Sequence, residues 1–119
     1  MSKYKNTKIY CITNDIDNYK YIGSTSKRIL NDRLFLHLCD STKPPSYKHT
    51  YTSKLYEHIR KIGQYYFNIE LLEEYPCSND FEMRCREQYW LDSYTDKSLL
   101  LNERRAVALK KYKQSQGDG

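Results

Sequence analysis

The fold is decided by two stretches near the start of the chain, Lys8-Ile9-Tyr10-Cys11-Ile12-Thr13 and Tyr19-Lys20-Tyr21-Ile22-Gly23. Both are rich in β-forming residues, and the cluster of turn residues at 14–18 separates them, so we expect a β-hairpin. A four-residue loop at 14–17 sets a register in which Tyr10 faces Tyr21. Opposed residues point to the same face of a sheet with Cβ atoms about 4.5–5.5 Å apart. The hairpin is therefore predicted to present two phenols together.

A helix is expected next, because Ser24-Thr25-Ser26 offers N-cap candidates and the apolar line of Leu30, Leu34 and Leu38 has helical spacing. Arg33 and His37 are four residues apart, so this helix should carry them on one flank. Residues 39–51 are predicted to form a loop, and residues 54–62 a second helix that ends at Gly63.

The second half of the chain adds one strand and further helices. Alternation over residues 67–71 predicts the strand. Asn79-Asp80-Phe81-Glu82 resembles a capping box, which predicts a helix to about residue 94 with Glu87 near its middle. Residues 103–113 are expected to form a basic helix and residues 114–119 to be frayed. The predicted fold class is α+β, a small three-stranded antiparallel sheet flanked by helices.

Size and composition indicate one intracellular domain. The chain has 119 residues, of which 39% are hydrophobic. This length fits one domain, expected at residues 1–105, followed by a basic, partly disordered extension at 106–119. No apolar stretch approaches the ~20 residues of a membrane helix, and no secretory leader is recognisable. The four cysteines lack metal-site spacing and are expected to be small core residues; cytoplasm and nucleus are not distinguished.

The charge is unevenly distributed along the chain. Residues 1–65 carry twelve Lys and Arg against five Asp and Glu, residues 66–102 carry three against eight, and residues 103–119 carry five against two. A basic first half and a basic tail favour a polyanionic partner that meets part of the surface, and ordinary solubilising charge is the alternative.

A set of side chains spread over these elements has the chemistry for phosphodiester hydrolysis. That reaction needs an acceptor for a proton of water, a carboxylate that anchors a hard cation, and a positive group on the phosphate. Tyr10 or Tyr21 with His37, then Glu87 and Arg33, supply one of each. Mg²⁺ takes one or two carboxylates and retains waters, so a single Glu is a sufficient anchor. Taken singly, each of these residues is more often structural than catalytic.

The order of these motifs resembles the GIY-YIG endonucleases. Ile9-Tyr10 and Tyr21-Ile22-Gly23 look like the paired motifs that name that family, and Arg33-Leu34 with His37 looks like its helix motif. Glu87-Gln88-Tyr89-Trp90-Leu91 is similar to its metal-glutamate helix, and Leu101-Asn102 to its closing asparagine. The resemblance covers about residues 7–105. Lys8 stands where the family has the first glycine, a position without a chemical role.

The resemblance implies an endonuclease that uses one Mg²⁺ or Mn²⁺ ion, similar to the catalytic domains of homing endonucleases and of viral or mobile elements. It implies Tyr10 as general base or water-orienting phenol, Tyr21 as its partner, Arg33 on the scissile phosphate, and His37 in proton transfer. Glu87 would bind the metal and Asn102 would support the site; His49 is a fainter candidate. We expect Arg33, Lys20 and the cation to lower the pKa of Tyr10, and the choice of Tyr10 or His37 as base stays open.

The expected partner is DNA, duplex or branched, with no membrane. It should run along Lys8, Lys20, Lys27, Arg28 and Arg33, with a second contact through the tail residues Arg104, Arg105, Lys110, Lys111 and Lys113. No separate recognition domain is expected in a chain of this length, so specificity would come from DNA structure, a homodimer or a protein partner. A nucleic-acid-binding module that keeps the fold without cutting is the alternative.

Overall fold

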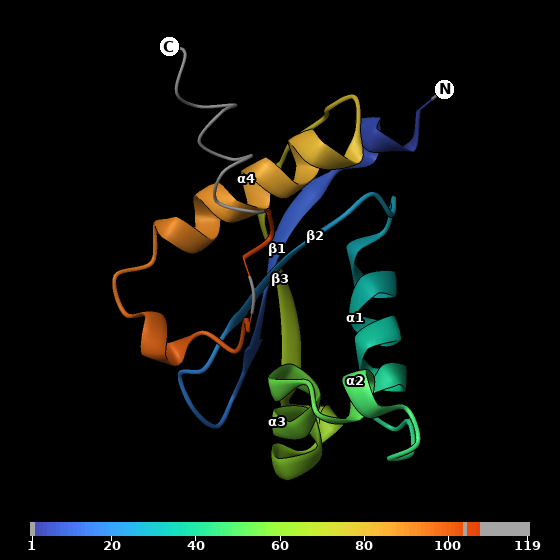
Figure 1. Ribbon diagram of the computed structural model, residues 1–119, viewed down its shortest axis with the longest axis vertical. Coiled ribbons are helices and arrows are strands. Elements are labelled where there is room, and N and C mark those ends of the chain that lie inside the picture. Colours follow the sequence, from blue (N-terminus) through green and yellow to red (C-terminus); the bar gives the residue numbers. More distant parts are fainter. Residues whose placement is uncertain (1, 104, 108–119) are drawn as a thin grey trace.

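The computed structural model describes residues 2–103 and 105–107. It contains a three-stranded antiparallel sheet in the order β2-β1-β3, made of β1 (Lys8–Asn14), β2 (Tyr21–Thr25) and β3 (Phe67–Glu74). The helices are α1 (Leu30–Asp40), α2 (Lys48–Tyr51), α3 (Lys54–Ile62) and α4 (Asp80–Asp92), with 3₁₀ turns at Lys3–Asn6, Gln64–Tyr66 and Lys97–Leu99 (Figure 1). The predicted α+β class and the predicted antiparallel sheet are confirmed.

The register of the hairpin differs from the prediction by two residues. Tyr10 lies opposite Gly23, and Tyr21 lies opposite Ile12. β2 therefore begins two residues later than expected, because Asn14 closes the turn differently: its side chain accepts from the backbone of Ile16 and Asp17, which lengthens the loop. Side chains alternate with period two, so a shift of two residues keeps Tyr10 and Tyr21 on one face.

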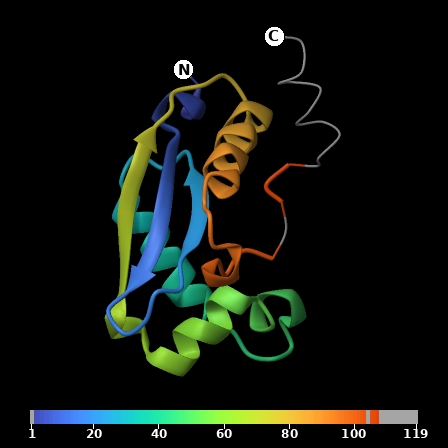
Figure 2. The ribbon, with the colours of Figure 1, turned by 90° about the vertical axis from the view of Figure 1, so that its left-hand side faces the viewer.

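Each face of the sheet packs against its own helices. On one face, Tyr10 and Ile12 pack with Leu55 and Ile59 of α3, and the predicted apolar line of α1 covers them. On the other face, Ile9 and Ile22 pack with Leu91 of α4. Figure 1 shows α4 on one side of the strands and α1 on the other, and Figure 2 shows the three strands side by side with α1 behind them. Because the side chains of β1 alternate between the two faces of the sheet, this one strand contributes to two small cores.

Helix α1 starts later than the sequence predicted. Ser24 and Thr25 continue β2, and the helix begins at Leu30 after Ile29, which supplies no side-chain cap. Ser24 pairs with Ile9 and Thr25 with Lys8, and this pairing with β1 prevails over the capping preference of the hydroxyl residues. The predicted loop at 39–51 is likewise interrupted by the single turn of α2.

The other helix ends follow their local signals. α3 ends at Gly63, whose φ of 113° suits glycine. The side chain of Asn79 caps α4 by accepting from the backbone N–H of Glu82, and the Glu82 carboxylate reaches back to the N–H of Ser78. The helix ends at Asp92, two residues earlier than predicted, and β3 runs on to Glu74.

The chain after α4 returns to the free edge of β2. The backbone of Lys20 pairs with that of Leu99 and Leu101, and both side-chain amide atoms of Asn102 bond the backbone of Ile22. The predicted basic helix is absent from residues 103 and 105–107, and its remainder lies outside the described residues.

All four cysteines lie in the described residues and none forms a disulfide, but they do not share one environment. Cys11 and Cys85 are buried, Cys77 is half-buried, and Cys39 is exposed. The prediction of small core residues is therefore wrong for Cys39, which lies on the outer side of α1 near its end. Within the described residues, no helix has the length and hydropathy to cross a membrane.

Candidate active site

Three of the predicted residues form a hydrogen-bonded network on the α1 face of the sheet. The hydroxyl of Tyr10 lies 2.8 Å from Nε2 of His37, and Nε of Arg33 donates to the same hydroxyl at 3.3 Å. Arg33 and His37 occupy neighbouring turns of α1, as predicted, so both reach one phenol. Tyr21 joins the group through its ring, which meets the His37 ring edge-on at 5.7 Å.

Gly23 makes room for the Tyr10 side chain. A Cβ atom at Gly23 would lie 2.3 Å from the Tyr10 hydroxyl and 2.4 Å from the ring carbon that bears it. These distances are far below van der Waals contact, so only glycine allows the phenol to cross its partner strand and reach His37. The glycine is required here for close approach, because no unusual φ is involved.

Burial governs the proton affinities of this network. Tyr10 is 1% exposed and His37 is 2% exposed. Burial raises the pKa of Tyr10 well above its ordinary value of 10.0, and the charge of Arg33 offsets only part of that effect. Burial, and then the charge of Arg33, lowers the pKa of His37 to about 3. The expectation that Arg33 and Lys20 lower the pKa of Tyr10 is thus wrong, since desolvation outweighs the nearby cation.

Glu87 of α4 approaches β2 from the opposite face of the sheet. Its Oε1 accepts from the Ser24 hydroxyl at 2.5 Å and lies 3.9 Å from a terminal nitrogen of Arg84. The side chain is 6% exposed, and burial raises the pKa of the carboxyl above its ordinary value, partly opposed by Ser24 and Arg84. Both contacts use Oε1, so among the described residues Oε2 has no competing partner and is available to a cation.

The geometry of β2 explains how residues from both faces meet. Tyr21 points to the α1 face, and Ser24, three residues later, points to α4. Because β2 is the edge strand, groups from the two faces come together around that edge. Asn102 holds this edge by accepting from the Ile22 N–H at 3.0 Å and donating to its carbonyl at 2.7 Å.

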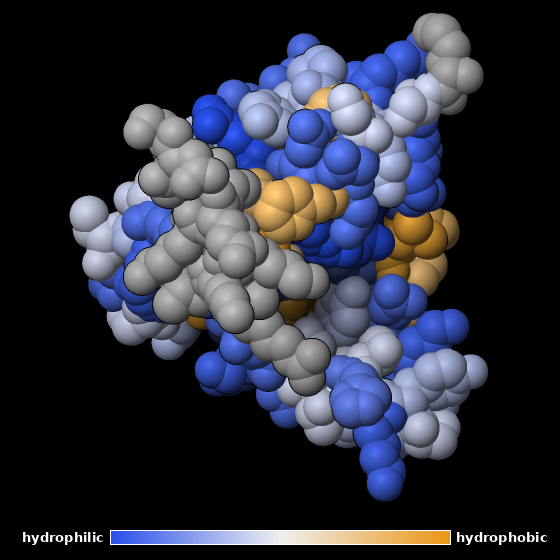
Figure 3. Space-filling view, turned by 45° about the horizontal axis from the view of Figure 1, so that its top comes forward, coloured by the Kyte–Doolittle hydropathy of each residue, from blue (hydrophilic) through white to orange (hydrophobic). Residues whose placement is uncertain are grey.

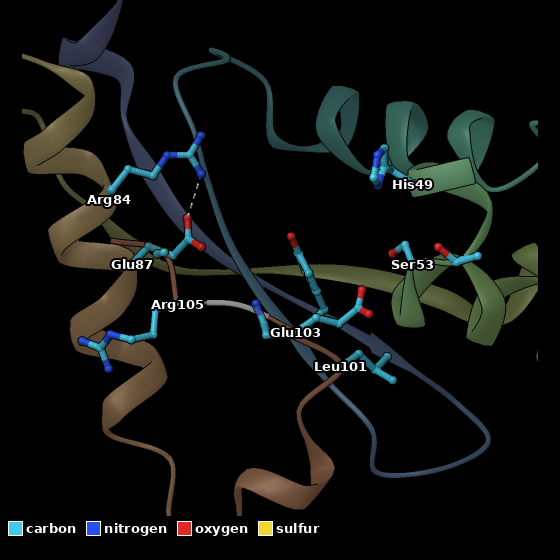
Figure 4. A pocket seen from close by; sticks show the side chains of 11 residues that line it. His49, Ser53, Arg84, Glu87, Leu101, Glu103 and Arg105 are labelled. Atoms are coloured by element: carbon cyan, nitrogen blue, oxygen red, sulfur yellow. Dashed lines mark ion pairs between the residues drawn. The ribbon is translucent and has the colours of Figure 1, made fainter. Parts of the chain in front are cut away.

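A pocket of about 570 Å³ opens at this edge, between α4 and the α2–α3 region (Figure 4). Glu87 and Arg84 project from the α4 wall, with their ion pair drawn as a dashed line, and His49 and Ser53 lie across from them. The full lining comprises Tyr21, His49, Thr52, Ser53, Arg84, Glu87, Leu101, Asn102, Glu103, Arg105 and Ala106.

The predicted site residues therefore divide into two layers. Tyr21, Glu87, Asn102 and the fainter candidate His49 line the pocket, whereas Tyr10 and His37 form a buried network behind Tyr21. The resemblance implies one site for these residues, but Tyr10 and His37 are buried and, like Arg33, are absent from the pocket lining.

The residues predicted to contact DNA also differ in their exposure and in whether the structure describes them. Lys27 and Arg28 are exposed in the loop between β2 and α1, and Lys20 is half-buried immediately before β2. Arg105 lies 3.7 Å from Asp92 of α4. Arg104, Lys110, Lys111 and Lys113 lie outside the described residues.

Three residues of the site were missed by sequence reasoning. Ser24 was interpreted as a helix cap and instead bonds Glu87. Arg84 was not among the candidates, although its spacing of three residues from Glu87 on a helix indicates contact. Tyr56 of α3 lies 2.8 Å from Nδ1 of His37, and no local sequence signal links residues 19 positions apart.

The pocket fits a hard divalent cation held by one carboxylate. Mg²⁺ commonly binds one or two carboxylates and keeps several waters, and the available Oε2 of Glu87 meets that need. Asn102 is not a ligand in this arrangement, because its amide is engaged with Ile22. The described residues hold no cluster of three or more His, Cys, Asp or Glu that would form an all-protein cage.

Comparisons with known proteins agree with this arrangement. The GIY-YIG catalytic domain matches residues 6–99. A viral relative, "Putative MSV199 domain-containing protein 146R" of Invertebrate iridescent virus 6, is 36% identical over 87 residues. That match covers 72% of this chain and 32% of the relative, so it spans about a third of the relative's length. No solved structure matches the chain significantly. With most of its length matched, the chain belongs to the GIY-YIG family of catalytic domains, which are endonuclease domains.

Proposed function

We propose that this protein is a divalent-metal-dependent endonuclease that hydrolyses phosphodiester bonds of DNA at the edge of β2. The observation that carries the proposal is the buried Glu87, whose Oε2 is available at the wall of a polar pocket. Burying an ionised carboxylate is costly unless a partner compensates it. A metal ion beside Oε2 would supply that compensation.

Each group at the pocket has a role that follows from its position. Glu87 would hold Mg²⁺ or Mn²⁺, which supplies Lewis-acid stabilisation of the phosphate and the leaving oxygen. Arg33 is not part of the pocket lining; it donates through Nε to Tyr10, and its terminal nitrogens would contact the scissile phosphate. Tyr21 lines the pocket and would orient the attacking water, with Asn102 keeping its strand in place.

Tyr10 and His37 would act together as the proton acceptor. The low pKa of His37 keeps its imidazole neutral at pH 7, and Tyr10 occupies its Nε2. Water therefore has no direct access to that nitrogen, and a proton that reaches His37 must pass through the Tyr10 hydroxyl. Tyr10 would accept the proton of water as it gives its own to His37.

Supercoiled plasmid tests the proposal. We expect nicked or linear product with Mg²⁺ or Mn²⁺, and none when EDTA replaces the metal. DNA binding is measured in parallel by a gel-shift assay. Binding without product across both metals would overturn the proposal and leave the alternative, a nucleic-acid-binding module that does not cut.

A further inference from the structure

The imidazole of His37 is held between two tyrosine hydroxyls. Its Nε2 lies 2.8 Å from the hydroxyl of Tyr10, and its Nδ1 lies 2.8 Å from the hydroxyl of Tyr56. A neutral imidazole has one N–H and one bare nitrogen. One tyrosine must therefore donate to the ring and the other must accept from it.

The surroundings select which tyrosine donates. The Tyr10 oxygen already accepts from Arg33, and Tyr10 is 1% exposed, so Nε2 of His37 is the acceptor in reach of its hydroxyl proton. A neutral ring that accepts a hydrogen bond at Nε2 carries its proton on Nδ1. The Tyr56 oxygen, 2.8 Å from Nδ1, is the acceptor for that proton.

We propose that Tyr56 is a positioning residue that holds His37 in the Nδ1–H tautomer, so that the bare Nε2 faces the Tyr10 hydroxyl. The proposal rests on the nuclease function above, in which Tyr10 receives a proton from water and gives its own to Nε2 of His37.

Nitrogen NMR of histidine-labelled protein reads the tautomer directly. In the wild type we expect a protonated Nδ1 and a bare Nε2 for His37, with the signal assigned by its loss in His37→Gln. In Tyr56→Phe, which keeps the ring and loses the hydroxyl, we expect a shift toward the Nε2–H form. Tyr94→Phe is the matched control, because it removes a half-buried hydroxyl from the opposite face of the sheet.

Single-turnover cleavage tests the positioning role. We expect Tyr56→Phe to slow cleavage by on the order of tenfold or more, with Tyr94→Phe unchanged. An Nε2–H tautomer in the wild type overturns the proposal, as does Tyr56→Phe with wild-type tautomer and rate. If the wild type cuts no DNA, the proposed function fails, whereas the nitrogen spectrum still decides the positioning role of Tyr56.

Discussion

Gly23 and Tyr10 form the tightest steric pair of the site. We expect Gly23→Ala to destabilise the protein by about 1–3 kcal/mol, because the new methyl group overlaps the phenol in a packed core. It should also break the contact between Tyr10 and His37. Urea unfolding measures the loss of stability. Wild-type stability in this variant would contradict the close approach of the two residues.

His37 makes the stability of the fold depend on pH. Its pKa falls from an ordinary value of 6.5 to about 3 in the folded chain. Between these values the unfolded state binds more protons, so stability rises with pH, by at most about 1.4 kcal/mol per pH unit for one group. We expect this contribution to be lost progressively as the pH falls from about 6.5 to about 3.

The His37→Gln variant isolates this effect. The buried Glu87 has a raised pKa and so contributes with the opposite sign, but that contribution is common to both proteins. The difference in unfolding free energy between wild type and variant, followed across this pH range, should therefore carry the slope of His37 alone. Equal slopes in the two proteins would refute the neutral, buried imidazole.

At the scale of elements, the edge of β2 depends on Asn102. Removing its side chain leaves the N–H and carbonyl of the buried Ile22 without their partners, which costs about 1–3 kcal/mol per unsatisfied group. We expect Asn102→Ala to speed hydrogen exchange at the Ile22 amide and to slow DNA cleavage. Asn68→Ala, which removes an exposed amide from β3, is the control. Unchanged exchange at Ile22 would contradict this role for Asn102.

Elements with strong local signals were predictable from the sequence. The turn cluster at 14–18, the stop at Gly63 and the cap at Asn79 each act within a few residues, and each appears in the structure. The start of α1 was not predictable in this way. Ser24 and Thr25 favour a helix cap locally, but pairing with β1 keeps them in the strand, and that pairing depends on tertiary context.

The candidate site shows the same division between local and long-range information. The spacing of Arg33 and His37 on one helix placed both at Tyr10, as expected. The burial of Tyr10 and His37 could not be predicted from the sequence, because it depends on how α3 packs over the sheet. For that reason the direction of the Tyr10 pKa shift was predicted wrongly.

At the scale of the whole molecule, the face seen in Figure 3 is mostly hydrophilic, with apolar side chains in small separate patches. Binding of DNA would thus depend on charge, through exposed residues such as Lys27 and Arg28 beside the site. Phosphate contacts weaken with salt, with a slope near −0.9 per contact on duplex DNA.

Deleting residues 108–119 removes three lysines, Lys110, Lys111 and Lys113. We expect weaker DNA binding and a salt slope reduced by up to about three units, with little change in cleavage at saturating DNA. The double variant Lys27→Ala and Arg28→Ala should reduce the slope by up to about two units. Fluorescence anisotropy over a range of salt concentrations measures both. An unchanged slope after the deletion would exclude a phosphate contact by the tail.

The central claim is that Glu87 holds the cation on which DNA cleavage depends. The most direct measurement is the rate of plasmid nicking as a function of Mg²⁺ concentration in wild type and Glu87→Gln, with Glu74→Gln on the exposed end of β3 as the control for lost charge. We predict saturable, Mg²⁺-dependent nicking in the wild type and the control, and none in Glu87→Gln, which should still fold and bind DNA. Wild-type nicking by Glu87→Gln would contradict the claim.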